Sequence, residues 1–274
     1  MKVGFVFTNY NNSHYTRDVI HSITLNKNYD DSYIVVVDNK SETADVELLI
    51  IIEQDYPSVK IIYNDENSGY FKGLNIGIEY LRKKYTDLDH MVIGNNDLFF
   101  PPDFIDTLYS NRSLFEKYPV ISPDLLTLDG VHQNPHVIDK ISKKREIIYD
   151  LYYSNYYLSV LIGYAAKVTK RFTDRSDEEQ FEVAQTIHQG YGACYILGPL
   201  FFEHFNLLWA PTFLMGEEFF LSKQLEKKGM KVYYEPSIKV NHHDHATMGK
   251  LPGKKLWKIS KDSHKIYRKY NKIY

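Results

Sequence analysis

The stretch of sequence that decides the fold is YIVVVD at residues 33–38, an unbroken apolar run that ends in a carboxylate. Runs of β-branched residues of this length are typical of strands buried on both faces of a parallel sheet. The turn formers Asn39-Lys40-Ser41 follow at once and end the run. We therefore expect a central strand of an α/β domain, with polar side chains at its carboxyl end.

Strands and helices alternate on both sides of this run. Apolar runs predict strands at 3–8, 59–64 and 90–93, and helical spacing predicts helices at 15–26, 43–54 and 70–84. This alternation predicts a mostly parallel sheet with right-handed crossovers. Later residues predict a helical insertion at about 138–187, a strand after Gly190, a helix at 217–228 and a strand at 231–234. We expect one domain at 1–249 and a helical tail at 250–274.

Composition narrows the class of protein. The 274 residues are 43% hydrophobic, which is enough for a sizeable core, and 33 Lys and Arg balance 35 Asp and Glu. A nucleic-acid partner is not expected, because such proteins carry a strong basic excess. The single cysteine, Cys194, excludes an internal disulfide and indicates a reducing compartment, most simply the cytoplasm. No cleavable signal and no apolar stretch of roughly 18–20 residues is found, so a soluble protein is expected.

Polar side chains gather where each predicted strand ends. They occur at 8–9, 38–39, 64–69 and 95–97. Ligands of open α/β sheets bind outside the carboxyl ends of the strands. Asn, Asp and Gly are also ordinary turn formers, but four successive clusters at one edge favour a ligand site.

Several common nucleotide-binding and catalytic motifs are missing. The chain has no Gly-x4-Gly-Lys-Ser/Thr loop, and the position after the first strand, where a dinucleotide fingerprint would stand, holds TNYNN at 8–12. Gly-x-Ser-x-Gly and His-Glu-x-x-His are absent too. Dehydrogenase, kinase, α/β-hydrolase and zincin functions are therefore disfavoured.

Taken in order, six segments resemble the GT-A glycosyltransferases of the large inverting family 2, which includes rhamnosyl- and galactosyltransferase-like enzymes of bacterial surface polysaccharide synthesis. The resemblance implies a GT-A, Rossmann-like fold and transfer of a sugar from a nucleotide diphosphate, UDP or dTDP foremost. The implied acceptor is a hydroxyl of a growing glycan or a lipid-linked saccharide. The segments are 3–12, 35–41, 67–77, 93–97, 192–202 and 216–243.

The resemblance implies a donor-nucleotide site at the first strand ends and along NSGYFKGLNIG at 67–77. Lys72 is the candidate for the diphosphate charge, with a solvated helix lysine as the alternative. KSET at 40–43 departs from the family's usual Ser-Ser/Thr-Asp-Gly. The residues assigned to donor binding are Thr8, Asn9, Tyr10, Asp38, Asn39, Asn67, Gly69, Lys72, Gly73, Asn75 and Asn96.

A metal site is implied by GNND at 94–97, which falls where the family has its Asp-x-Asp motif. Only Asp97 keeps a carboxylate there, and a hard cation on a diphosphate needs one or two. The family's strand that ends in His, six residues after a Pro, selects His242, with His243 and His245 as alternatives. The implied cofactor is Mg²⁺ or Mn²⁺.

The catalytic candidates are Glu217 and Glu218, in MGEEFFL at 215–221. Inverting transfer needs one general base for the acceptor hydroxyl, and the resemblance assigns it to Glu218. Adjacent helix residues point about 100° apart, so Glu217 would anchor the loop or bind acceptor. Acids that complement a helix dipole are the alternative. Gly192, Ala193 and Trp209 are assigned to the sugar and acceptor pocket, with core packing as the alternative for Trp209.

The tail at 250–274 carries nine Lys or Arg residues against one acid, Asp262. One interpretation is a cationic helix on an anionic membrane, which implies a peripheral protein at the membrane's inner face. The other is a solvated helix packed on the domain through Trp257 and its tyrosines.

Two other functions fit part of the pattern. A nucleotidyltransferase uses a similar sheet and metal, but the expected Gly-rich loop bearing Arg or Lys is missing after the first strand. A catalytically inactive relative that binds sugar or nucleotide fits the single carboxylate of Asp97. Donor hydrolysis or transfer discriminates between these functions.

Overall fold

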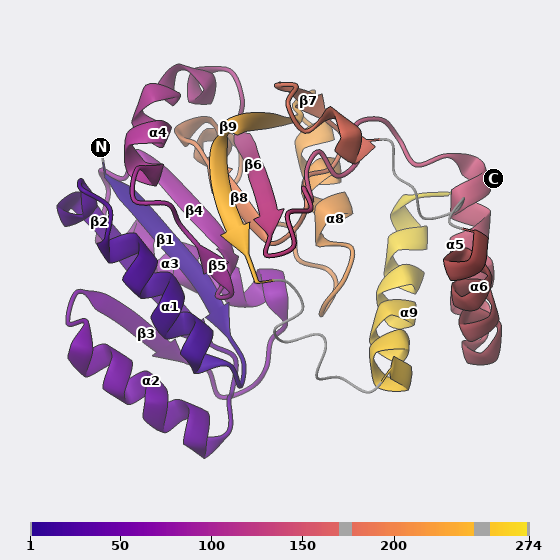
Figure 1. Ribbon diagram of the computed structural model, residues 1–274, viewed down its shortest axis with the longest axis horizontal. Coiled ribbons are helices and arrows are strands. Elements are labelled where there is room, and N and C mark those ends of the chain that lie inside the picture. Colours follow the sequence, from indigo (N-terminus) through magenta and orange to yellow (C-terminus); the bar gives the residue numbers. More distant parts are fainter. Residues whose placement is uncertain (1, 170–176, 244–252, 273–274) are drawn as a thin grey trace.

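One twisted sheet organises the molecule. The computed structural model describes residues 2–169, 177–243 and 253–272. Within them the strand order is β3-β2-β1-β4-β8-β6-β9-β5, with β7 paired to β9 (Figure 1). β5, β7 and β8 run opposite to the other strands, so the sheet is mostly parallel. The strands are β1 (Val3–Asn9), β2 (Ser32–Asp38), β3 (Val59–Tyr63), β4 (His90–Asn95), β5 (Leu98–Phe99), β6 (Val120–Thr127), β7 (Gln185–Ile187), β8 (Cys194–Leu197) and β9 (Val232–His242).

Helices cover both faces of the sheet, and each face has its own apolar core. Alternate residues of β1 show the division, because Phe5 and Phe7 join the core under α1, α2 and α4, whereas Val6 joins the core under α3, α7 and α8. The helices are α1 (Ser13–Thr24), α2 (Thr43–Asp55), α3 (Tyr70–Lys84), α4 (Phe104–Ser110), α7 (Pro199–His204) and α8 (Glu217–Glu226).

Three more helices, α5 (Lys143–Ser154), α6 (Tyr156–Thr169) and α9 (Gly253–Tyr270), lie at one end of the sheet. Figure 1 shows α9 between α8 and the α5–α6 hairpin. On its inner side, the Tyr267 ring contacts Phe219 of α8, with 4.4 Å between centroids. On its outer side, Arg268 pairs with Glu146 of α5 at 2.7 Å, and Trp257 donates to the Tyr152 carbonyl at 3.2 Å. The tail helix is therefore packed between two parts of the protein.

The α/β fold expected from the sequence is confirmed, and the elements between residues 3 and 95 begin and end within two residues of their predicted bounds. Several differences lie further along. β7 lies inside the helical insertion expected at about 138–187, so that region is not wholly helical. β9 runs past residue 234 to His242, where residues 124–127 of β6 pair with it in parallel. β6 itself was not expected, since Pro123 interrupts its apolar run and the register shifts beside that residue. Among the described helices, none is long and apolar enough to cross a membrane.

Candidate functional site

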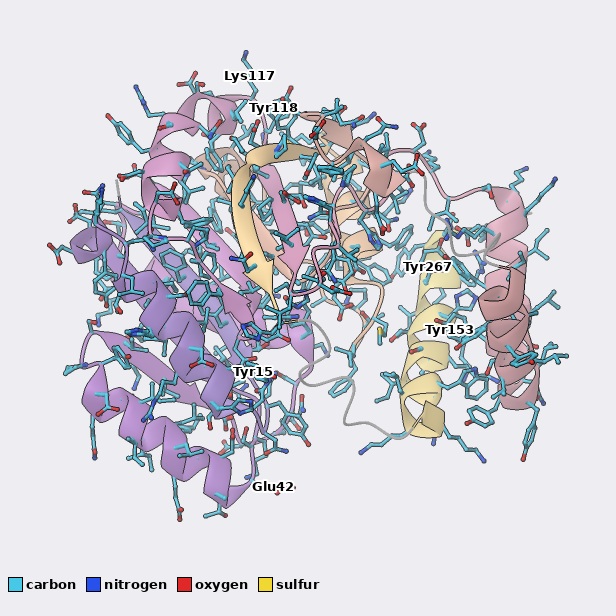
Figure 2. The ribbon with its side chains drawn as sticks, in the orientation of Figure 1. Tyr15, Glu42, Lys117, Tyr118, Tyr153 and Tyr267 are labelled. Carbon is cyan, nitrogen blue, oxygen red and sulfur yellow. The ribbon has the colours of Figure 1, made fainter. Side chains whose placement is uncertain are left out.

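The polar strand ends meet at one edge of the sheet, as the sequence pattern predicts. The register places Asn9 opposite Asp38, Thr8 opposite Asn95, and Leu98 opposite His242. Tyr15, labelled in Figure 2, lies at this edge, and its ring contacts His243 with 5.6 Å between centroids. His245, the other alternative ligand, lies outside the described residues.

Asn9 is the centre of a buried hydrogen-bond network at this edge. Its amide nitrogen donates to Asp38 Oδ1 at 2.9 Å and to Asp45 Oδ2 at 2.8 Å. Its carbonyl oxygen accepts from Thr16 Oγ1 at 2.9 Å and from Asn96 Nδ2 at 3.1 Å. Asn9 and Asn96 are buried to 0% and 3% exposure. Their side chains therefore join β1, α1 and the end of β4.

The carboxylate of Asp45 completes this network. Burial alone would raise its pKa, but hydrogen bonds from Ser13 and Asn9 outweigh burial and lower the pKa. The Ser13 backbone N–H donates at 2.9 Å and the Ser13 hydroxyl at 2.7 Å. An ionised Asp45 thus fixes the start of α1 against the end of β1. The sequence did not single out this residue, because its partners lie 32 and 36 positions away.

The glycine-rich segment packs tightly against its surroundings. Gly69 has φ +89°, and a Cβ there would lie 2.0 Å from the Phe213 carbonyl oxygen. A Cβ on Gly73 would lie 2.8 Å from the Asn39 amide nitrogen and 2.8 Å from Thr8 Cγ2. Both glycines are needed because backbone and strand ends approach them this closely.

The asparagines of this region mainly hold loops together. Asn39 Oδ1 accepts from Asn64 at 3.0 Å, and its Nδ2 donates to the Gly69 carbonyl at 3.1 Å. Asn67 Oδ1 accepts the Gly69 N–H at 3.0 Å. Asn75 makes two bonds to the backbone of Leu208, at 2.8 and 2.9 Å. Donor binding by these side chains stays a prediction.

Three other predicted site residues differ in exposure. Lys72 on α3 is exposed, and Tyr10 is 37% exposed, so both can reach a ligand. Trp209 is half-buried, and its ring packs on Phe220 of α8 and Tyr270 of α9 with centroid distances of 5.2 and 4.7 Å, so its place in the sugar and acceptor pocket stays a prediction.

Asp97 and His242 form a buried pair. His242 Nε2 lies 3.3 Å from Asp97 Oδ1, and the two side chains are 2% and 6% exposed. Within the described part of the chain neither atom has a hydrogen-bond partner. Gln133 Oε1, which only accepts, lies 2.7 Å from His242 Nδ1, so Nδ1 carries the hydrogen and Nε2 presents its lone pair to Asp97.

Two electron-rich atoms therefore face each other without a hydrogen between them. Such a pair fits a cation. The carboxylate oxygen suits Mg²⁺ or Mn²⁺, whereas imidazole is a ligand of transition metals and therefore favours Mn²⁺ over Mg²⁺. Among the described residues no group of three or more His, Cys, Asp or Glu side chains is arranged for a metal. The described residues alone would thus supply only part of a coordination shell.

Glu217 and Glu218 begin α8 directly after two residues in left-handed conformation, Met215 at φ 76° and Gly216 at φ 85°. This conformation is unusual for Met and sets the direction in which the helix starts. Glu217 is buried, and burial, with the Glu218 charge adding to it, raises its pKa to about 8. Glu217 is therefore protonated at neutral pH. Glu218 lies against Gly192, where an added Cβ would be 2.7 Å from Glu218 Oε1.

Tyr70 links the acids to the metal-binding candidates. Its hydroxyl donates to the Gly192 carbonyl at 2.8 Å. Burial raises its pKa well above 10, and the charges of Glu217, Asp97 and Glu218 add to that effect. The charges of these three carboxyl groups, from the β4–β5 turn and from α8, therefore act on one half-buried tyrosine. Neither Tyr70 nor Gln133 was predicted, because each is recognised only by what it contacts.

Fold and site together describe an α/β protein with a candidate ligand site at the carboxyl edge of its sheet. Residues 5–111 match the family model described as Glycosyl transferase family 2, which confirms the resemblance over the segment from β1 to α4. No curated protein matches the chain.

Three solved structures are similar over 88% of this chain. They are GalNAc-T7 with UDP, GalNAc and Mn²⁺ (13% identity, TM-score 0.58), the mannosyltransferase PcManGT from Pyrobaculum calidifontis with GDP-Man and Mn²⁺ (13%, 0.54), and TarS from S. aureus (9%, 0.57). The chain spans only 43%, 56% and 36% of their lengths. At these identities the likeness concerns the fold, and it confirms the GT-A fold.

Proposed function

We propose that the protein is an inverting glycosyltransferase that moves a sugar from a nucleotide diphosphate, UDP or dTDP, to an acceptor hydroxyl of a glycan or lipid-linked saccharide. One observation carries the proposal. His242 faces Asp97 at 3.3 Å at the carboxyl edge of a GT-A sheet, and the charges of Asp97, Glu217 and Glu218 all act on Tyr70. The partial match to family 2 supports the same activity.

Asp97 and His242 would hold Mg²⁺ or Mn²⁺ together with the donor diphosphate, which completes the coordination. Both buried atoms lack a partner within the described residues, and Gln133 presents the ligating lone pair of His242. Two of the similar structures were solved with Mn²⁺. When bound, the cation neutralises charge on the leaving diphosphate.

Glu218 is the proposed general base. Its carboxylate accepts the proton of the acceptor hydroxyl as that oxygen bonds to the anomeric carbon. The bond from this carbon to the diphosphate oxygen breaks at the same time, and the nucleoside diphosphate leaves with the electron pair. Attack opposite to the leaving group inverts the configuration. Glu217 cannot share this role at neutral pH, because its raised pKa keeps it protonated.

The first test identifies the donor. Melting temperature is measured with UDP, dTDP, GDP and CMP, each with and without Mn²⁺. A bound nucleotide stabilises the folded state, so one nucleoside diphosphate should raise the melting temperature, and more so with metal. Stabilisation by none of them would contradict the proposal.

The second test separates a transferase from an inactive relative. With the donor class found above, Glu218→Gln should lower sugar transfer or donor hydrolysis by about 100- to 10,000-fold, because the amide cannot accept a proton. Nucleotide binding should stay within about twofold. Glu226→Gln, at the far end of the same helix, is the control and should keep its rate. Equal rates for Glu218→Gln and the parent would refute the base assignment, and an inactive parent that binds nucleotide would indicate the inactive relative.

A further inference from the structure

The exposed face of α6 is apolar over residues 156–166. None of residues 156–166 is charged. Four side chains spaced to lie on one side of α6 are exposed, and we call them the α6 stripe: Tyr157 (76%), Val160 (54%), Leu161 (64%) and Tyr164 (69%). Ile147 and Leu151 of α5 are also exposed, at 40% and 49%. Contiguous apolar surface of this kind marks an interaction site on a folded protein.

The hairpin is held in place by its other side. Arg268 of α9 contacts Asp150 at 2.5 Å as well as Glu146, and His264 contacts Asp150 at 2.7 Å. Figure 2 shows Tyr153 of α5 and Tyr267 of α9 among the side chains where these helices meet. The hairpin is therefore already docked, and the α6 stripe faces away from that contact.

Positive charge lies near the Tyr157 end of the stripe, because the Tyr157 ring lies 5.7 Å from the ring of its neighbour Tyr156. At the turn between α5 and α6, Lys254 Nζ lies 5.7 Å from the Tyr156 ring centroid, and Lys261 donates to the Ser154 carbonyl at 2.9 Å. Lys255 and Lys258 on the same end of α9 are exposed. The only acid of α9 is Asp262, so this helix has a strong positive charge.

We propose that the α6 stripe and the lysines at the start of α9 dock the protein onto an anionic lipid bilayer. Apolar side chains beside lysines match the boundary between acyl chains and acidic headgroups. A second copy is a poorer occupant, because two-fold pairing through this face would bring like charges together. α6 is too short to cross a bilayer, so it would lie along the surface. This inference goes beyond the proposed transfer and does not depend on it.

The test is flotation of the full chain with vesicles of phosphatidylcholine alone and with about 30% phosphatidylglycerol. Binding should be stronger to the anionic vesicles and should weaken as salt is raised. The variant Val160→Glu/Leu161→Glu should lower the bound-to-free ratio at least tenfold. Lys255→Ala/Lys258→Ala should lower it on anionic vesicles only.

Leu48→Glu/Ile51→Glu is the matched control, because these α2 residues are exposed to 44% and 42% but lie far from α9. The control should bind vesicles as the parent does. Melting temperature with nucleotide and Mn²⁺ is measured on every variant, so that loss of vesicle binding is separated from loss of folding or of the donor site. Equal vesicle binding by the parent and Val160→Glu/Leu161→Glu would overturn the proposal. A concentration-dependent dimer that this variant abolishes, without vesicle binding, would overturn it in favour of a second copy.

Discussion

Two groups of polar residues lie at the same edge of the sheet, and they differ in how their atoms are partnered. Around Asn9, the side-chain polar atoms have hydrogen-bond partners within the protein, and these include the carboxylate of Asp45. Around Tyr70, buried atoms of Asp97, His242 and Glu217 have none within the described residues. A buried polar atom without a partner is destabilising, and around Tyr70 three such atoms lie on residues that the sequence marks as site candidates. We therefore predict a structural role for the first group and a ligand-binding role for the second.

Of the substitutions proposed here, Asp97→Ala should have the largest effect on metal binding by the group around Tyr70. Removing a ligating oxygen should weaken Mn²⁺ affinity more than about 100-fold, because losing a residue that only orients a ligand already costs 10- to 100-fold. Mn²⁺ should then no longer enhance stabilisation by the nucleoside diphosphate. Calorimetric titration of Mn²⁺ in the presence of that nucleotide measures the effect.

Gln133→Ala should cause an intermediate loss of Mn²⁺ affinity in the same titration. It keeps both ligands but frees the His242 ring, so its loss of affinity should fall between those of the parent and Asp97→Ala. Unchanged Mn²⁺ affinity in Asp97→Ala would show that the pair is not the metal site.

Asn9→Ala should affect folding rather than binding. Its removal leaves buried groups of Asp38, Asp45 and Asn96 short of hydrogen bonds, which should lower the free energy of unfolding by roughly 3 kcal/mol. Urea denaturation measures this loss. Asn64→Ala, which removes one part-buried bond, should lose about 1 kcal/mol or less. A stable Asn9→Ala protein that fails to bind nucleotide would reverse the assignment of this network to structure.

Glu217→Gln should change how stability depends on pH. In the parent, the folded state keeps the Glu217 proton up to about pH 8, whereas the unfolded chain loses it near the ordinary value of 4.5. Stability contributed by the neutral buried acid is therefore complete below pH 4.5 and is lost as pH rises towards 8. The amide has no proton to lose, so the variant should gain roughly 3 to 4 kcal/mol over the parent between pH 5 and 8, at about 1.4 kcal/mol per pH unit. Parallel stability curves for the two proteins would contradict the raised pKa.

The sequence predicted most of the sheet, because strands such as 33–38 are specified by their own apolar residues. The family resemblance named Asp97 and His242 together as metal ligands, and in the structure the pairing of β5 with β9 brings them to one place. The sequence did not reveal β6, whose pattern is broken by Pro123, or that Asn75 bonds to Leu208, 133 positions away. Whether an asparagine holds a loop or a ligand depends on partners distant in sequence, and residue type alone does not encode them.

Lys72→Ala should have the smallest effect of these substitutions. It tests a residue whose role the comparison of the two groups does not decide. Lys72 belongs to neither group, since its exposed side chain leaves the first turn of α3 near the strand ends. An exposed ammonium group near a diphosphate contributes modestly, because water and salt screen it, so nucleoside diphosphate affinity should fall about three- to fivefold. That loss should shrink at 0.5 M salt and be absent for the nucleoside alone, because the nucleoside lacks the charge that Lys72 would meet.

Lys83→Ala, at the far end of α3, is the control and should leave the affinity unchanged. Equal affinities for Lys72→Ala and Lys83→Ala would show that Lys72 is a solvated surface residue of the helix. The cation and the N-terminus of α3 would then be the groups that bind the diphosphate.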